Sequence, residues 1–235
     1  MDNYEKKAYK EMLEWELKIL KNKSLVQSLS KKAQNKINSY IPEKAHQVVT
    51  EAIKQMVKAT LAGSDFTTVK GRSTGLSLEE KEELVEEKLN SYRKTAAVEG
   101  AGTGAGGILL GLADFPLLLS IKMKFLFEVA AIYGYDTKNY EERLFLLHVF
   151  QLAFSNDDKR RETYHLIKHW QEEKDKLADM DWRSFQQEYR DYIDLVKLFQ
   201  MIPGIGAVVG AYANYNLLDQ LGVTAKNCYR LRLLK

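Results

Sequence analysis

GAGTGAGGILLGLADFPLLLSI, residues 100–121, is the stretch of sequence that decides the fold. Its only charged residue is Asp114. Each glycine inside a helix costs about 1 kcal/mol relative to alanine, so a helix rich in glycine needs a compensating contact. Helical spacing of four residues separates several of the glycines here, which lie at Gly100, Gly102, Gly104, Gly106, Gly107 and Gly111.

A second segment repeats this spacing nearer the C-terminus. Residues 203–212, PGIGAVVGAY, place Gly206 and Gly210 four apart. Glycines on one helical ridge remove the side chains that would keep a second backbone away. We therefore predict that the two glycine-rich segments are helices that cross each other closely, near residues 104 and 208.

The pattern G-x-G-x-x-G also occurs, at Gly102, Gly104 and Gly107. In a dinucleotide-binding unit this pattern follows a buried strand and opens a helix. Here residues 84–99, LVEEKLNSYRKTAAVE, have the pattern of an amphipathic helix instead. No Gly-Lys-Ser/Thr sequence is present for a phosphate-binding loop. We therefore expect no nucleotide, and no other cofactor.

Composition favours an all-α protein in which a bundle of several helices is built around the two glycine-rich helices. The 235 residues include only three prolines, with 45% apolar and 29% charged residues, an ordinary globular balance. We predict N-terminal helices in 1–62, a loop in 63–75 and a glycine-rich helical core in 76–235, together one domain. The net charge of +3 is too small to indicate a nucleic-acid partner.

The N-terminal sequence predicts a location inside the cell. MDNYEKKAYKEMLEWE is charged throughout, unlike a signal peptide. Cys228 is the single cysteine, which fits a reducing compartment and a buried thiol. Two windows, residues 100–121 and 198–218, approach membrane-spanning length but contain polar residues or Asp114. We interpret both as core helices, with partial insertion into a bilayer left open.

A basic amphipathic segment follows the first predicted helix, residues 4–20. Between residues 18 and 44 the only acidic residue is Glu43. Such a segment can bind an anionic membrane surface, and a solvated helix face remains the alternative. The candidate surface comprises Lys18, Lys21, Lys23, Lys31, Lys32 and Lys36.

Candidate chemical groups are few. His165 and His169 stand four apart, as in half of a zinc site, although such pairs also occur by chance. Glu99, Asp114 and Glu128 lie in or beside apolar sequence, where burial raises a carboxyl pKa and suits acid–base chemistry. His148 lies among apolar residues and is expected in the core.

Local signals predict where several helices begin and end. Ser77 with Glu80, and Asn139 with Glu142, have the spacing of a capping box. Gly134 and Gly222 are expected to end helices. Pro116 is expected to begin a helix with Asp114 as its cap, and Thr224 to cap a last short helix.

Three segments together resemble the EcsC family. They are residues 99–136, EGAGTGAGGILLGLADFPLLLSIKMKFLFEVAAIYGYD; residues 142–150, ERLFLLHVF; and residues 201–234, MIPGIGAVVGAYANYNLLDQLGVTAKNCYRLRLL. The similarity extends from about Ala45 to the C-terminus. The resemblance implies a cytoplasmic location and association with an ABC exporter system. It supplies no catalytic motif.

The sequence therefore favours a non-catalytic accessory or interaction protein at the cytoplasmic membrane face, with ABC transporter subunits and an anionic membrane surface as expected partners. Two alternatives stay open. One is a hydrolase acting on a peptide or lipid through a buried carboxylate near Asp114. The other is a lipid-binding module whose glycine-rich helices open to admit acyl chains.

Overall fold

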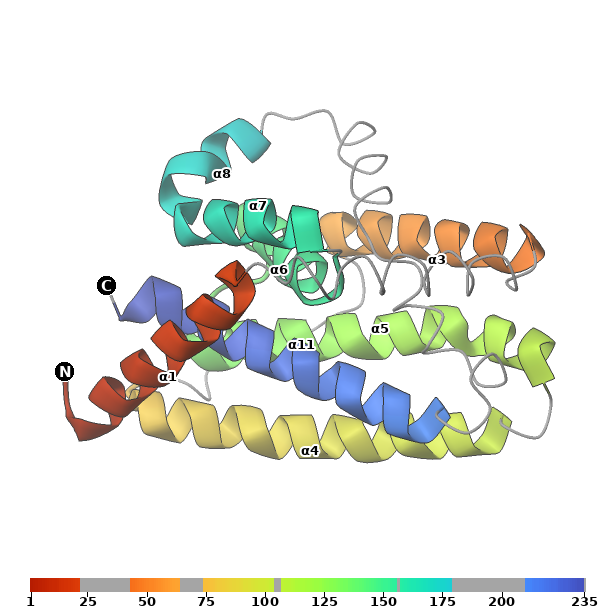
Figure 1. Ribbon diagram of the computed structural model, residues 1–235, viewed down its shortest axis with the longest axis horizontal. Helices are drawn as coiled ribbons and strands as arrows, with labels where there is room; N and C mark the ends of the chain where they lie inside the picture. The colour runs from red at the N-terminus through yellow and green to blue at the C-terminus, as the bar shows by residue number, and fades with distance from the viewer. Residues whose placement is uncertain (22–42, 64–73, 104–106, 156, 179–209, 235) are drawn as a thin grey trace.

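The protein is all-α, as predicted from its composition. The computed structural model describes residues 1–21, 43–63, 74–103, 107–155, 157–178 and 210–234, and these form eight helices and no strand. The helices are α1 (Asn3–Leu20), α3 (Glu43–Ala62), α4 (Leu78–Thr103), α5 (Gly107–Tyr133), α6 (Tyr140–Phe154), α7 (Asp157–Lys168), α8 (Trp170–Ala178) and α11 (Gly210–Leu233) (Figure 1).

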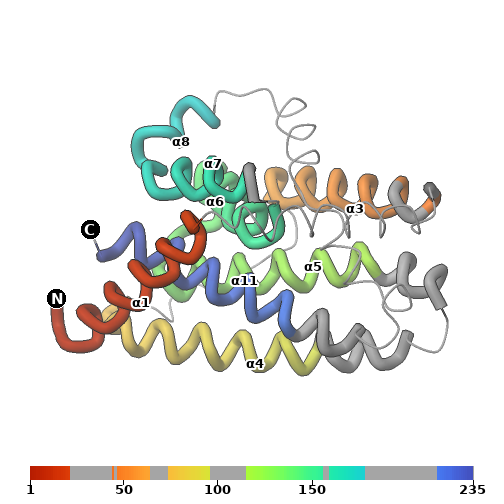
Figure 2. The backbone as a smooth tube through the Cα atoms, in the orientation of Figure 1, coloured from red at the N-terminus to blue at the C-terminus, as the bar shows by residue number. Residues whose placement is uncertain are grey.

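Helix α5 lies in the middle of the fold. Helices α3 and α4 pack along it, and α11 makes its most extensive contact with α4. Helix α1 crosses over α11 at the end of the molecule where both termini lie (Figures 1 and 2). Buried apolar side chains from all eight helices form one continuous cluster. The helices of the described residues thus share a single hydrophobic core.

The helices flanking the glycine-rich segments pack together, but the predicted crossing point itself lies outside the described residues. Gly100 belongs to the last turn of α4, Gly107 and Gly111 to the start of α5, and Gly210 begins α11. Gly104 and Gly206 fall outside the described ranges. The close approach near residues 104 and 208 therefore stays a prediction.

Two of the predicted helix ends are confirmed by their hydrogen bonds. Ser77 Oγ accepts from the backbone N–H of Glu80 at 3.3 Å, and the Ser77 N–H donates to the Glu80 carboxylate at 2.7 Å. Gly134 ends α5 with a φ of 94°, a conformation that favours glycine. The N–H of Tyr135 then reaches back to the Ala130 carbonyl at 2.9 Å.

The helix start predicted at Pro116 is wrong, whereas the start predicted after Asn139 is confirmed without its capping box. Pro116 and Asp114 lie inside α5, so Asp114 does not cap a helix that begins there. Burial of Phe115, Leu118 and Leu119 offsets the hydrogen bond that a proline removes from a helix. Asn139 does precede α6, but its side chain makes no capping hydrogen bond.

The predicted break in the last helix is also wrong. Helix α11 continues from Gly210 to Leu233 without interruption. Gly222 lies inside it, where its missing side chain makes room for Leu89 of α4. Thr224 is an interior residue whose hydroxyl donates to the Gln220 carbonyl at 2.7 Å. Among the described helices, none is both long enough and apolar enough to span a membrane.

Candidate functional site

Of the three predicted carboxylates, the structure describes the contacts of Glu128. Glu128 Oε1 accepts a hydrogen bond from the Tyr92 hydroxyl at 2.7 Å, and its Oε2 lies 2.8 Å from Lys88 Nζ. Glu128 therefore ties α5 to α4. Glu99 lies in α4 and Asp114 in α5, and their side chains fall outside the description.

The predicted histidine pair does not share one helix. Helix α7 ends at Lys168, so His169 lies at the junction with α8. Both side chains are exposed, and His169 Nδ1 lies 2.9 Å from the carbonyl oxygen of His165. No group of three or more His, Cys, Asp or Glu residues within the described ranges is arranged to hold a metal ion.

An ion-pair network joins α1, α4 and α11, with Arg230 and Glu82 buried and Glu11 exposed. Arg230 of α11 donates to both carboxylate oxygens of Glu82 on α4, at 2.7 and 2.6 Å, and to Glu11 of α1 at 3.0 Å. The Tyr4 and Tyr133 hydroxyls also donate to Glu82. Burial alone lowers the pKa of Arg230, but the hydrogen bonds and charges of Glu82 and Glu11 outweigh it and raise the pKa.

A second charged cluster joins α11 to α6. Arg232 Nη1 donates to the two oxygens of Glu142 at 3.0 and 2.8 Å, and Tyr229 donates to Glu142 at 2.6 Å. The guanidinium carbon of Arg232 lies 3.6 Å from the centre of the Tyr135 ring and 4.3 Å from that of Phe145. Burial raises the pKa of Glu142, and Arg232 opposes that rise.

Neither of these two charged clusters was predicted from the sequence. Arg230 and Arg232 lie in the last helix, where no partner was predicted for them, and Glu142 was predicted to form half of a capping box. The one available signal was the apolar residues beside the two arginines, of which Leu231 and Leu234 are buried. A pattern of this kind shows that a helix is covered, but not which charge meets which.

Three other ionisable groups are enclosed by the core. His148 Nδ1 lies 2.8 Å from the Leu144 carbonyl, and burial lowers the pKa of His148 to about 4; the predicted core role is confirmed. Cys228 is buried, and burial raises the pKa of its thiol. Lys122 on α5 is fully buried, and burial lowers the pKa of its amine to about 8.

The outer face of α1 carries an apolar stripe bordered by lysines. Tyr9, Leu13 and Leu17 are 38%, 39% and 68% exposed, and their spacing of four puts them on one face. Exposed lysines on the same helix and at its end are Lys6, Lys7, Lys10, Lys18 and Lys21. Of the predicted basic surface, Lys21 borders this stripe and Lys18 is exposed about 100° around the helix from Leu17, while Lys23, Lys31, Lys32 and Lys36 lie outside the described residues.

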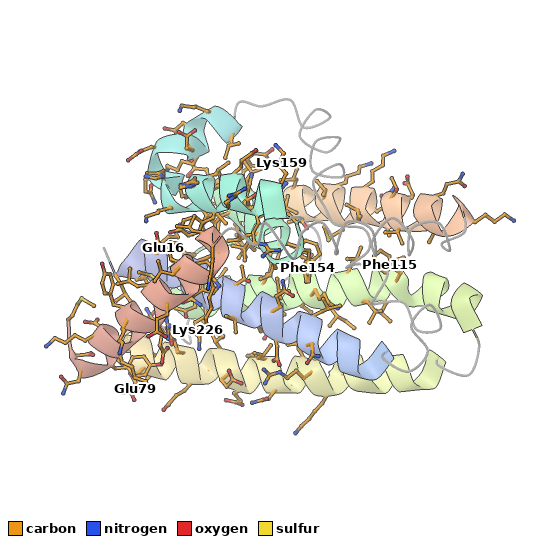
Figure 3. The ribbon with its side chains drawn as sticks, in the orientation of Figure 1. Glu16, Glu79, Phe115, Phe154, Lys159 and Lys226 are labelled. Atoms are coloured by element: carbon orange, nitrogen blue, oxygen red, sulfur yellow. The ribbon has the colours of Figure 1, made fainter. Side chains whose placement is uncertain are left out.

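The inner face of α1 is fixed to the rest of the fold. Ala8 and Met12 are buried, and α1 contacts α4, α7 and α11. Near the end of the helix Glu16, labelled in Figure 3, accepts a hydrogen bond from Lys168 of α7. At its start the Asp2 side chain accepts from the Glu5 N–H at 2.7 Å. Helix α1 is therefore held in place with its apolar stripe outward.

The fold and these sites define an all-α protein with a charged, closely paired core and an amphipathic N-terminal helix on its surface. The chain belongs to the EcsC protein family, whose model matches residues 6–234. That match includes α1 and so extends further toward the N-terminus than the resemblance indicated.

Two curated proteins of Bacillus subtilis (strain 168) are similar to the chain. Protein EcsC is 57% identical over 225 residues, which cover 96% of this chain and 94% of that protein. Uncharacterized protein YdbA is 33% identical over 155 residues, which cover 64% of this chain and 57% of that protein. No solved structure matches the chain.

Proposed function

We propose that this protein is a non-catalytic accessory protein that binds the cytoplasmic face of a membrane and associates there with an ABC exporter. The outward stripe of Tyr9, Leu13 and Leu17 with its neighbouring lysines is the observation that carries the membrane part of the proposal. The resemblance to the EcsC family supports the exporter part.

The chemistry of the α1 face fits an anionic lipid surface. Burying a leucine side chain contributes about 1.5–3 kcal/mol, and each lysine near such a surface contributes about 1 kcal/mol. Leu13 and Leu17 with Lys6, Lys10 and Lys21 therefore supply several kcal/mol, enough for reversible binding. The exposed acidic residues of α1 and its cap that oppose such binding are Asp2, Glu11 and Glu14.

The interior charges support a role without catalysis. Glu82 accepts hydrogen bonds from the buried Arg230 and Glu142 from the partly exposed Arg232, and Glu128 is held by Tyr92 and Lys88. A cation beside a carboxylate favours its ionised form and so makes it a weaker base. These three carboxylates therefore act as structural links between helices. The hydrolase alternative would depend on Asp114, whose side chain lies outside the description.

Flotation with lipid vesicles tests the membrane part. We expect the protein to float with phosphatidylcholine vesicles that contain phosphatidylglycerol, and to float less at high salt, which screens the lysines. The double variant L13E/L17E should weaken binding by about 100-fold or more, because two apolar contacts are lost and charge of the wrong sign is added.

The matched control is V223E, which adds a glutamate at another exposed apolar position, on α11. It should bind like the wild type. Flotation of L13E/L17E equal to that of the wild type, or no flotation of the wild type at all, would overturn the membrane assignment.

Capture from detergent-solubilised membranes, with the full chain as bait, tests the exporter part separately. Recovery of ABC transporter subunits is the expected result. Positive flotation without any transporter subunit in the capture would leave a membrane-binding protein whose proposed partner is wrong.

A further inference from the structure

Lys122 occupies the centre of the buried face of α5. Its exposed fraction is 0%. At 100° per residue, its position on the helix falls in the middle of a stripe of core residues. A leucine or phenylalanine is expected at such a position. The members of this stripe are Phe115, Leu118, Leu119, Phe125, Leu126 and Val129, all of them buried.

Lys122 is a buried cation that meets no partner among the described residues. No hydrogen-bond acceptor in the described part of the chain reaches its Nζ, whereas Arg230 has Glu82 and Glu11, and Arg232 has Glu142. The hydroxyl of Thr60 on α3 is also buried without a hydrogen-bond partner among the described residues. Helix α3 packs along α5, so this pair of helices contributes two unsatisfied polar groups to the interior.

We infer that Lys122 binds the negatively charged head of an amphiphile, a carboxylate or phosphate on a hydrocarbon chain. A cation enclosed by a protein is normally neutralised by an anion, and here the described residues supply none. The apolar part of such a ligand would meet an apolar core, to which α3, packed along α5, contributes aliphatic and thioether side chains: Val49, Ile53, Met56 and Val57.

The charge is present under ordinary conditions. Burial lowers the pKa of Lys122 to about 8, so most of the amine is still protonated at neutral pH. An uncharged core amine would need no counter-ion, but this one does. The inference does not depend on the α1 surface, which belongs to a different helix.

Binding of defined amphiphiles to the delipidated full chain tests the inference. The probes are oleate, oleyl phosphate and oleyl alcohol, which share a hydrocarbon chain but differ in the head. We expect the wild type to bind oleate or oleyl phosphate at least about tenfold more tightly than oleyl alcohol, as one charged contact worth about 1.4 kcal/mol requires. The two acids distinguish a carboxylate site from a phosphate site.

The variant K122M removes the charge and keeps an unbranched apolar chain. We expect it to lose the preference for charged heads while unfolding at a temperature equal to or above that of the wild type. The control K124M removes an exposed lysine two residues away and should bind like the wild type. Native mass spectrometry of the protein as purified should show a bound acidic amphiphile that K122M lacks.

Two results would overturn the inference. One is binding of oleate and oleyl phosphate by the wild type no tighter than binding of oleyl alcohol. The other is equal binding of the acids by wild type and K122M. Neither result bears on vesicle flotation through Leu13 and Leu17, so failure here is distinguishable from failure of the proposed membrane role.

Discussion

Arg230 and Lys122 are both cations inside the same core, and they differ in what surrounds them. Arg230 meets Glu82 and Glu11 at hydrogen-bonding distance, and the pKa of Arg230 is raised even though burial opposes this. Lys122 meets no such group among the described residues, and burial lowers its pKa. Both side chains are buried, but their pKa values shift in opposite directions because only Arg230 has carboxylate partners among the described residues.

This difference distinguishes a charge with a structural role, Arg230, from a charge that lacks a counter-ion among the described residues, Lys122. The Arg230 network fixes the relative positions of three helices, because each carboxylate comes from a different one. Lys122 forms no link between helices among the described residues. While it is charged, its burial lowers the stability of the fold. A cost of this kind is expected at binding sites, where a ligand supplies the missing group.

Removing the partner of Arg230 should have the largest effect on stability. E82Q removes the main counter-charge of Arg230 and leaves a buried guanidinium only partly compensated. We expect the free energy of unfolding to fall by about 3–5 kcal/mol. Urea unfolding followed by circular dichroism measures this loss.

The neighbouring variant E83Q is the control, because Glu83 is exposed and should change stability by less than about 0.5 kcal/mol. Adding R230M to E82Q should recover part of the loss, since no unpaired buried charge then remains. A loss below about 1 kcal/mol for E82Q would show that the network is not a structural charge pair.

Removing the charge of Lys122 should raise stability, whereas E82Q lowers it. The pKa of Lys122 falls from 10.5 to about 8 on folding, which corresponds to about 3 kcal/mol. We expect K122M to stabilise the delipidated protein by up to this amount at pH 7. Urea unfolding at several pH values measures it.

The pH dependence identifies the cause of this gain. Between pH 8 and 10.5 the unfolded chain holds the Lys122 proton while the folded chain releases it, so wild-type stability rises with pH. The advantage of K122M should therefore shrink across this interval, and K124M should show no such trend. An advantage that does not change with pH would mean that packing, and not charge, is responsible.

The sequence predicts the helices of this fold better than their ends. The all-α class, the core position of His148 in α6, the Ser77 cap and the stop at Gly134 follow from composition, apolar neighbours in the sequence and local capping chemistry. In α6, 12 of 15 residues are buried. Pro116 and Gly222 were misread because local propensity favours a helix end at each, whereas burial along α5 and α11 carries both helices through.

The candidate sites were harder to predict, because they depend on contacts between distant residues. Glu82 and Arg230 are 148 positions apart, and no local pattern connects them. The lysine-rich character of the N-terminal region was visible in the sequence. Lys122 was not singled out, because a lysine within an apolar run of a helix looks like an ordinary surface position until the packing around α5 is known.

The smallest expected effect on stability comes from a change in steric fit between α4 and α11, the two helices that Glu82 and Arg230 also join. A Cβ atom added at Gly222 of α11 would lie 2.7 Å from Leu89 Cδ2 on α4. Alanine gains about 1 kcal/mol of helix propensity over glycine, but crowding a buried side chain costs about 1–3 kcal/mol. We expect G222A to lower the unfolding free energy by about 1 kcal/mol.

A double-mutant cycle with L89A shows whether this crowding is the cause. Leu89 is buried, and L89A alone should cost about 2–5 kcal/mol because it leaves a cavity. The new methyl group of G222A points at that cavity, so the double variant should lose about 1 kcal/mol less than the sum of the single losses. Additive losses would mean that Gly222 is needed for some reason other than room for Leu89.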